Sequence, residues 1–439
     1  MSSNKNNFAS TSMETMQWFV FLLASSVAMP IVIGSIYNMN FIEVSGLMQR
    51  TFLVVGLVSF LQGWLGHRLP IMEGPAGIWV SIFSVMAITG NQQGVSSGET
   101  LRVLETTMIF TGVFLLLFGL FKVAQRILPV FTPLVTGTFF FLLTVQLSGT
   151  FLQGMLGLQQ GGESIQLTEA ALAFITFFIV LGLSAFGKGW LSSYAVFIGI
   201  IIGWILHVFI RSGEKEITEE MQLVALPDWF AWGLPTFDGG AILIAFITAV
   251  ILISNVVASV VAVNQSLGNK QTNTGTEINR GTTFLGINHG LAGVFSSIAN
   301  VPLATSAGFI SLTGQKNKRP FLYASILLVA IAFFPPIVSI ISGIPASIAN
   351  AALMATFVQL VALAINNVTA EKIDSRKGTI VGVSYLIGIG TMFLPTEVFQ
   401  ELPGIIQNLA SNGLLIGTGL VILLEQLWKP DEATEQLRS

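Results

Sequence analysis

The sequence predicts an all-α polytopic membrane protein with fourteen transmembrane helices, arranged as two seven-helix inverted repeats. Hydrophobic residues make up 53% of its 439 residues and charged residues only 9%, whereas a soluble domain carries about 25% charged residues. Apolar runs of about 20 residues, the length that a helix needs to cross the hydrocarbon core, recur along the whole chain. Lys and Arg are also divided unequally between the connections, as the orientation of a membrane protein requires.

Taken in order, the apolar segments fall at roughly regular intervals. They span residues 16–37, 48–66, 71–90, 106–121, 127–147, 168–187, 190–210, 239–263, 283–299, 302–313, 320–341, 345–366, 378–395 and 404–425. Two of them differ from ordinary spans. Segment 71–90 includes the sequence EGPAG near its start, and segment 302–313 is short and centred on small and hydroxylic residues. We therefore expect both to be broken helices.

The basic residues orient the chain. With a cytoplasmic N-terminus, all but four of the 19 Lys and Arg residues fall on the inside, as the positive-inside rule requires. The exceptions are Arg50, Arg102, Arg211 and Lys215. Both termini are then cytoplasmic. The long external connection 211–238 separates two sets of seven segments. Because each set is odd in number, the two halves are antiparallel, as in many secondary transporters.

The two broken segments hold matching third positions in the two halves. Short segments interrupted by Gly or Pro at such positions point to a binding site at the bilayer midplane. Gly74, Pro75, Gly77 and Gly308 would let the chain extend before a half-helix begins, whose free N–H groups and positive dipole end face a polar ligand. The alternative is that these small residues only allow close helix packing; the symmetric placement favours a site.

Composition excludes several classes of function. There is no cysteine, and the three histidines lie far apart in sequence, so we predict no metal site and no cofactor. The net charge of −3 gives no indication of nucleic-acid binding. The polar N-terminus has no signal-peptide pattern, so we expect the first apolar segment to be retained. An intramembrane enzyme has little support, because no acid–base pair or nucleophile–His arrangement is present.

Several motifs resemble the nucleobase–ascorbate transporter family, the uracil and xanthine permeases, over nearly the whole length. QWFVFLLASSVAMPIVIG is similar to the opening helix of that family, ILPVFTPLVTGTFFFL to its FPPVVTGT signature, and FFPPIVSIISGIP to a later junction. TSAGFISLTG at 305–314 keeps Gly308, Thr313 and Gly314 of the signature motif, but Thr305 and Ser306 replace its acid or Gln and its Asn. In ILISNVVASVVAVNQ, Asn255 takes the place of the substrate-binding Glu of the family and Val256 that of a His.

The resemblance implies a division into two domains and a mode of transport. A core domain would comprise residues 14–125 and 239–342, and a gate domain residues 126–212 and 343–428. Movement of the core against the gate would give alternating access, and the family often forms dimers through the gate. The implied activity is import of a purine or related nucleobase across the cytoplasmic membrane. The alternatives are an anion transporter of the sulfate or bicarbonate type and an uncoupled facilitator of the same fold.

The candidate substrate-binding residues combine the resemblance with polarity at depth. They are Asn255, Thr305, Ser306, Gly308, Gly77, Ile78, Trp79 and Ser26. A neutral amide such as Asn255 can donate and accept at once, as the edge of a base requires, although it could also join helices. Thr305 and Ser306 could instead cap a helix. Trp79 could stack on the ring of the base or lie at the membrane interface. Ser26 could line the cavity or serve only in helix packing.

Energy coupling has two candidate residues. The resemblance places carboxylates at the positions of Asn255 and Thr305, and neither residue can carry a proton. Glu73, beside the break of segment 71–90, could take the role of proton carrier, although it could also be a carboxylate at the cytoplasmic end paired with Arg68. His289 is the second candidate, with packing as the favoured interpretation.

Overall fold

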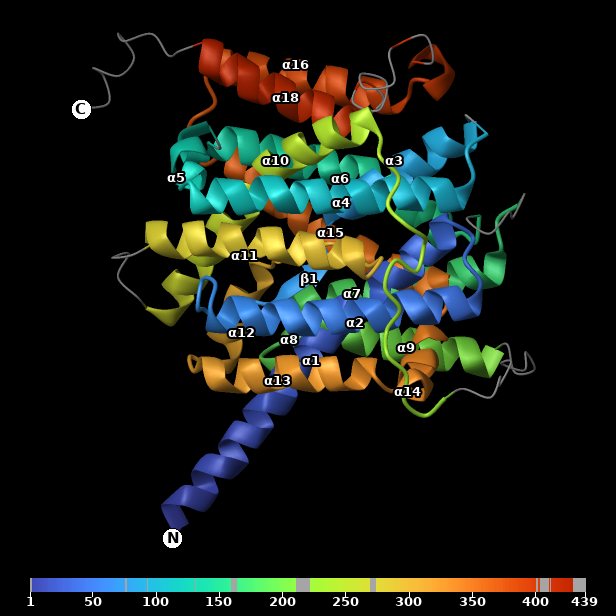
Figure 1. The fold of residues 1–439 in the computed structure, drawn as a ribbon, viewed down its shortest axis with the longest axis vertical. Coiled ribbons are helices and arrows are strands. Elements are labelled where there is room, and N and C mark those ends of the chain that lie inside the picture. Colours follow the sequence, from blue (N-terminus) through green and yellow to red (C-terminus); the bar gives the residue numbers. More distant parts are fainter. Residues whose placement is uncertain are drawn as a thin grey trace.

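The computed structural model describes residues 2–75, 77–92, 94–130, 132–158, 164–210, 222–268, 274–399, 402, 410 and 412–428. Long helices lie side by side and form the body of the molecule, and the first turns of α1 project away from it (Figure 1). A short two-stranded sheet lies inside this body, with β1 between α2 and α11 (Figure 1). The body is therefore helical, with a single small interruption at its centre among the described residues.

The first half of the chain contains the first strand and nine of the helices. In order they are α1 (Ser2–Ile36), α2 (Phe41–Trp64), β1 (Glu73–Pro75), α3 (Gly77–Gln92), α4 (Ser97–Leu120), α5 (Val123–Ile127), the 3-10 turn η1 (Leu128–Val130), α6 (Pro133–Met155), α7 (Leu167–Phe186), α8 (Trp190–Ser193) and α9 (Ala195–Ile210). The expected segments 127–147 and 190–210 are thus each divided into a short piece and a long helix.

The second half repeats the order of long helix, helix, strand and short helix. It comprises α10 (Gly239–Leu267), α11 (Thr274–Val294), β2 (Asn300–Pro302), α12 (Thr305–Thr313), α13 (Lys318–Ala332), α14 (Pro335–Ser342), α15 (Ala346–Val368), α16 (Ser375–Met392), the 3-10 turn η2 (Thr396–Phe399) and α18 (Gly413–Leu427). Segment 320–341 is bent by 93° between α13 and α14, where Pro335 cannot continue the helix. Part of the expected segment 404–425 lies outside the described residues.

Local sequence explains where several helices begin and end. Asn40 and Glu43 form a reciprocal capping box at the start of α2, with Glu43 N donating to Asn40 Oδ1 at 3.0 Å, which satisfies two otherwise free amides. Ser96 and Glu99 do the same for α4. At the other end of α12, Gly314 has φ of +71°, a left-handed conformation that glycine adopts without strain.

Two groups of helices pack closely within themselves. In the first, α4 packs on α10 and α11, α2 on α13, and α1 on α2 and α13. In the second, α15 packs on α6 and α7, α18 on α6 and α16, and α7 on α9. Contacts between the groups include α1 with α15 and α3 with α6. The paired strands belong with the first group, since α2 contacts β1 and α10 contacts β2. Of the helices that follow them, α12 contacts α10 of the first group, and α3 contacts α4 of the first group and α6 of the second.

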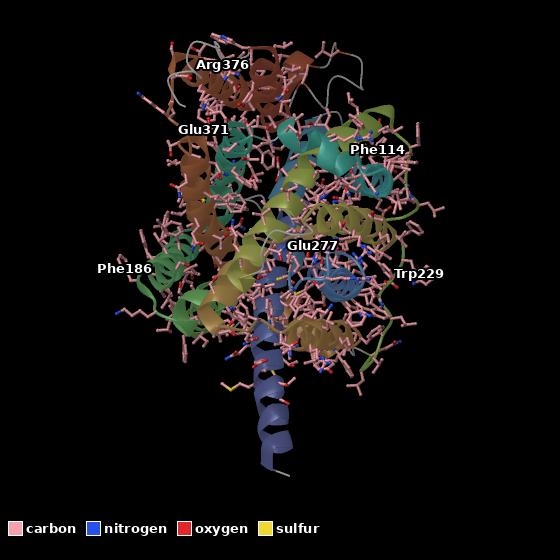
Figure 2. The ribbon with its side chains drawn as sticks, turned by 90° about the vertical axis from the view of Figure 1, so that its left-hand side faces the viewer. Phe114, Phe186, Trp229, Glu277, Glu371 and Arg376 are labelled. Atoms are coloured by element: carbon pink, nitrogen blue, oxygen red, sulfur yellow. The ribbon has the colours of Figure 1, made fainter. Side chains whose placement is uncertain are left out.

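Seven described helices are long and apolar enough to cross a membrane, or eight if α13 and α14 form one span. Three shorter apolar helices, α3, α9 and α18, accompany them. Large apolar side chains stand at the periphery, among them Phe186 and Trp229, which are 86% and 71% exposed (Figure 2). Such a surface matches a lipid environment rather than water. The chain is a multi-pass membrane protein.

Candidate functional site

The two strands, β1 and β2, pair in an antiparallel sheet, with Glu73 opposite Pro302, Gly74 opposite Val301 and Pro75 opposite Asn300. All six residues are buried. A helix follows each strand, α3 from Gly77 and α12 from Thr305. Extended backbone at membrane depth needs partners for its amides and carbonyls, and the two strands provide them for each other. The arrangement brings the starts of two short helices, more than 220 residues apart in sequence, to the same sheet.

The start of α12 is open. Ala304, the N-cap residue, makes no side-chain capping bond, and both Ala304 and Thr305 are exposed. A Cβ added to Gly308 would meet no heavy atom within 4 Å, so there is free space beside the first turn. The Ser306 and Ala307 amides of this turn donate to the Leu303 and Ala304 carbonyls at 3.1 and 3.0 Å. The positive end of the helix dipole still makes the terminus suitable for an electron-rich group.

Ser306, by contrast, is buried and already bonded. Its hydroxyl accepts a hydrogen bond from the Met72 amide at 3.0 Å. This bond attaches the first turn of α12 to the residue that leads into β1. Ser306 therefore has a structural role in this conformation.

Asn255 lies on α10 and is half-buried. Its side chain makes no hydrogen bond with any described residue. One turn further along, the Ser259 hydroxyl donates to the Pro302 carbonyl of β2 at 2.7 Å. Residues four apart share a helix face, so Asn255 lies on the same face of α10 as Ser259, the face that contacts β2. An amide with free donors and acceptors at this place can serve a ligand.

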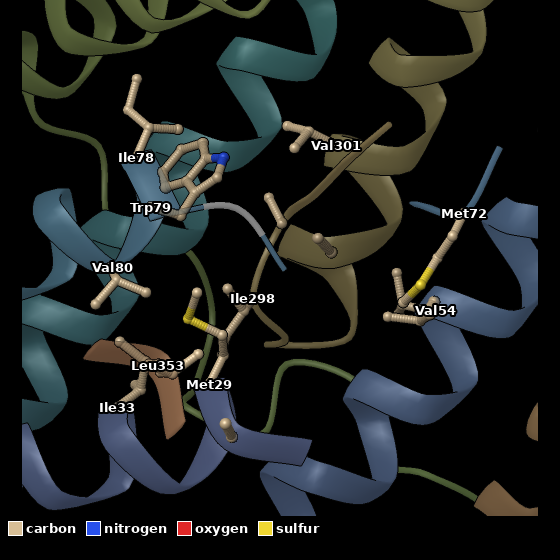
Figure 3. Packing of buried hydrophobic residues seen from close by; sticks show 14 of the residues in the cluster. Met29, Ile33, Val54, Met72, Ile78, Trp79, Val80, Ile298, Val301 and Leu353 are labelled. Carbon is tan, nitrogen blue, oxygen red and sulfur yellow. The ribbon is translucent and has the colours of Figure 1, made fainter. Parts of the chain in front are cut away.

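The start of α3 is covered by protein. Ile78 and Trp79 are 2% and 0% exposed, and in Figure 3 Trp79 lies between Ile78 and Val301 of β2. A Cβ on Gly77 would lie 3.1 Å from Phe357 Cζ. The Trp79 indole donates to His289 Nε2 at 3.0 Å, so its polar edge is used within the protein.

His289 is fully buried and both of its ring nitrogens are occupied. Nε2 accepts from Trp79, so Nδ1 carries the proton and donates to the Leu285 carbonyl at 2.9 Å. Ser26 is buried as well, and its hydroxyl donates to Leu22 O at 2.7 Å within α1. Neither side chain has a free group to offer to a ligand in this conformation.

Glu73 is fully buried at the first position of β1. Asn288 Nδ2 of α11 donates to its Oε2 at 3.2 Å, and His67 Nε2 lies 3.6 Å from its Oε1. Its backbone amide donates to the Ser59 hydroxyl of α2 at 3.0 Å. Arg68, the partner considered from sequence, is exposed. The acid thus lies deeper than a residue at the membrane surface, in a polar group that links α2, β1 and α11.

His67 and Asn288 are two site residues that the sequence did not single out. His67 precedes Glu73 closely in the sequence, whereas Asn288 contacts Glu73 across 215 residues of chain. The one local signal is the pair of polar residues in GINHGLAG, Asn288 and His289, inside a helix that spans apolar surroundings. Intramembrane polar residues are expected to face partners, but the sequence does not indicate which partners.

Comparison with known proteins gives consistent matches along the chain. Residues 9–397 match the permease family that includes the xanthine and uracil permeases. The chain is 31% identical over 422 residues to a protein named putative purine permease YwdJ of Bacillus subtilis, covering 94% of this chain and 95% of that protein. It is 23% identical to the xanthine permease of the same organism, covering 96% and 94%. It is 24% identical to the uric acid transporter UacT of Escherichia coli, covering 93% and 84%.

Solved structures share the fold at low sequence identity. The transmembrane domain of the cyanobacterial bicarbonate transporter BicA superposes with a TM-score of 0.59 at 14% identity, covering 94% of this chain and 97% of that one. The overall structure of SLC26A9 gives a TM-score of 0.63 at 12% identity, covering 94% and 65%. These likenesses concern the fold alone.

Proposed function

From the premise that this chain belongs to the nucleobase–ascorbate transporter family of permeases, we propose that it imports a purine or a related nucleobase across the cytoplasmic membrane by alternating access. The chain is a nucleobase transporter. Its relatives named for purines, xanthine and uric acid make a purine the favoured substrate class. The family is made of transporters, which is consistent with a protein that is not an enzyme.

Two observations carry the site proposal: the exposed start of α12, and an Asn255 amide that makes no hydrogen bond with any described residue and lies one helical turn from Ser259, which bonds β2. Thr305 and Gly308 are exposed there, and Asn255 lies on the face of α10 that contacts β2. A base carries N–H and C=O groups along one edge, which an amide can pair by donating and accepting together. The positive dipole end of α12 would favour a carbonyl oxygen or ring nitrogen of the same base at this terminus.

The other candidate residues would support this site without contacting the base directly. Ile78 and Trp79, which are buried at the start of α3, would form part of its wall. Gly77 would allow the backbone there to lie close to Phe357. Ser306 would hold α12 against the lead-in to β1. Ser26 would keep α1 regular near the site. In this proposal the contacts with the base come first from Asn255, Thr305 and the backbone around Gly308.

We propose that the chain crosses the membrane fourteen times as two inverted seven-helix repeats with α3 and α12 as broken third helices. The core domain would hold residues 14–125 and 239–342, and the gate domain residues 126–212 and 343–428. The packing of α2, α4, α10, α11 and α13 in one group and of α6, α7, α15, α16 and α18 in another supports this division. Cytoplasmic termini follow from the excess of Lys and Arg on that side, and a homodimer through the gate, surrounded by lipid, follows from the family.

Proton symport through Glu73 is the proposed form of energy coupling, with His289 as the second candidate. Among the described residues, no Lys or Arg lies within ion-pair distance of the buried Glu73 carboxyl. A carboxylate without a cation in such a place is costly, and protonation removes that cost. A facilitator driven only by the substrate gradient is the alternative.

Anion transport is not favoured. The bicarbonate transporter and SLC26A9 are similar at 12–14% identity, which concerns architecture, whereas the relatives that are more similar in sequence are named for nucleobases. An uncapped helix start would accept an anion as readily as a carbonyl, so the distinction needs an experiment rather than geometry.

The deciding experiment is an uptake assay in cells that lack their own carriers. Radiolabelled hypoxanthine, guanine, xanthine and uracil would be compared with sulfate and bicarbonate. We expect saturable uptake of at least one purine and none of either anion. Uptake of an anion without uptake of any base would refute the proposal.

A further inference from the structure

A second polar group lies apart from the open start of α12. It consists of Glu73 on β1, His67 in the connection after α2, and Asn288 on α11. All three side chains are fully or almost fully buried, and three of their polar atoms have no partner: His67 Nε2, Glu73 Oε1 and Asn288 Oδ1. Buried polar atoms are normally hydrogen-bonded, so three free ones in a single group indicate a function beyond packing.

The state of His67 follows from its backbone neighbour. The Leu69 amide donates to His67 Nδ1 at 3.1 Å, and a nitrogen that accepts a hydrogen bond carries no proton. The turn that makes this bond passes through Arg68, which has φ of +64°. The neutral ring therefore carries its proton on Nε2, which lies 3.6 Å from Glu73 Oε1. His67 can donate towards the carboxyl, but it cannot become a cation while the Leu69 bond is present.

Asn288 connects the same carboxyl to the second strand. Its Nδ2 donates both to Glu73 Oε2 at 3.2 Å and to the Asn300 carbonyl at 3.0 Å. Both partners are acceptors, so this orientation of the amide is the one that suits an ionised Glu73. If Oε2 were protonated, it would need an acceptor, and Asn288 Oδ1 has no partner. Rotation of the amide would supply that acceptor and would remove the donor from Asn300.

The surrounding charges do not compensate the carboxylate. Lys318 of α13 is the cation on that side, and its Nζ donates to the Gly63 carbonyl at 3.3 Å. His289, next to Asn288 on α11, is occupied by Trp79 and Leu285. Glu73 is thus surrounded by neutral donors, in the part of the chain that the structure describes.

We propose that Glu73, His67 and Asn288 form one proton-binding centre, in which His67 remains a neutral donor that positions the carboxyl and Asn288 transmits its protonation to β2. The inference rests on the proposed coupling through Glu73 and adds two positioning residues to it. One proton from the outer solution forms an O–H bond at Glu73 and later leaves to the cytoplasm. No bond between heavy atoms changes and no electron is transferred.

The consequence for the substrate site follows from the position of Asn300. It begins β2, five residues before α12 starts at Thr305, and Pro302 of the same strand is held by Ser259 of α10. If Asn288 no longer donated to the Asn300 carbonyl, the first residue of β2 would lose its bond to α11. The last residue of the strand, Pro302, would stay bonded to α10 through Ser259. Protonation would thereby alter the position of α12, where the base is proposed to bind.

The test uses the purified protein in liposomes with an imposed pH gradient and a radiolabelled purine that the wild type transports. Wild type should accumulate the purine above equilibrium, and Glu73→Gln should only equilibrate it. His67→Gln, which keeps a neutral donor, should retain accumulation. His67→Phe removes the N–H group that lies 3.6 Å from the carboxyl, so the pH of half-maximal uptake should differ from that of wild type, whereas in His67→Gln it should not.

Asn288→Leu should reduce gradient-driven accumulation about tenfold or more, towards the level of Glu73→Gln, while exchange of labelled for unlabelled purine continues. Asn279→Leu is the matched control, because Asn279 is a buried amide on the same helix that makes no hydrogen bond with Glu73; it should accumulate purine as wild type does.

Loss of accumulation in His67→Gln would show that His67 itself carries the proton. Normal accumulation in Asn288→Leu would remove Asn288 from the pathway. Either result overturns the centre while leaving nucleobase transport intact.

A spectroscopic measurement does not depend on the folding of these variants. In wild-type protein with carbon-13 in the side-chain carbonyl of asparagine, infrared difference spectra between high and low pH should show an asparagine carbonyl band that shifts to lower frequency as a buried carboxyl is protonated. The shift should be absent in Glu73→Gln. A carboxyl band without any asparagine shift would contradict the switch, and absence of accumulation in wild type would refute the coupling itself.

Discussion

The starts of α3 and α12 follow strands that pair with each other, yet protein covers one and leaves the other open. Trp79 on α3 is completely buried and bonded to His289, whereas Thr305 on α12 is exposed and its side chain bonds to no described residue. A Cβ on Gly77 would press on Phe357, and one on Gly308 would meet nothing within 4 Å. Two segments with the same sequence signature can therefore serve different purposes, one as a support and one as a ligand surface.

The largest expected effect comes from filling the open side. Gly308→Val should abolish purine uptake, because the new side chain would occupy the space beside the first turn of α12 that we assign to the base. Membrane insertion and thermal stability should be largely unchanged, since a Cβ at this position meets no protein atom within 4 Å. Uptake would be measured in carrier-free cells, with membrane protein quantified by immunoblot.

Gly382→Val on α16 is the matched control for this substitution, because a Cβ there also meets nothing within 4 Å. It should transport normally. Uptake at the wild-type rate in Gly308→Val would mean that the open start of α12 is only a packing feature, and the comparison with α3 would lose its functional meaning.

Removing the amide of Asn255 should have the next largest effect. Asn255→Ala should weaken purine binding by about 1–3 kcal/mol, the usual cost of leaving a polar partner unpaired. The folded state should lose little, because the side chain makes no hydrogen bond within the described structure. Binding would be followed by competition of unlabelled purines with a labelled one. Unchanged affinity for every base that the wild type binds would remove Asn255 from the site.

The covered start of α3 predicts the reverse pattern. Gly77→Val should lower the stability of the protein by about 1–3 kcal/mol, the usual cost of overpacking, because the added atoms meet Phe357 and Leu143. Affinity of the folded protein for purine should be close to that of wild type. The thermal midpoint in detergent and equilibrium binding on the same sample would test this. A normal midpoint combined with lost binding would place Gly77 in direct contact with the base.

The sequence predicts irregular backbone near both places, but it does not predict how the two helix starts differ. Gly74 and Pro75 indicate where a helix cannot run on, and both lie in β1. Gly308, expected from the sequence to lie before the second half-helix, instead lies inside α12, and the extended residues there are Asn300–Pro302 of β2. Whether a helix start is covered depends on side chains from distant elements, such as Phe357 of α15. The depth of Glu73 was missed for the same reason, because its partner Asn288 is contributed by α11, far along the chain.

The smallest effect concerns the hydroxyl of Thr305, for which the sequence left capping and ligand binding equally open. Ala304 holds the N-cap position and Thr305 is the first helical residue, so its hydroxyl is not needed as a cap. Thr305→Val keeps the shape and removes only the hydroxyl. If that group donates to the base, affinity should fall by about 0.5–1.5 kcal/mol, the net value of one hydrogen bond, with no change in thermal midpoint. Ser311 lies on α12 like Thr305, and its exposed hydroxyl donates to Ser266 of α10. Ser311→Ala should leave affinity unaltered. Equal affinities in both variants would leave the backbone of α12, rather than its side chains, as the surface that the base meets.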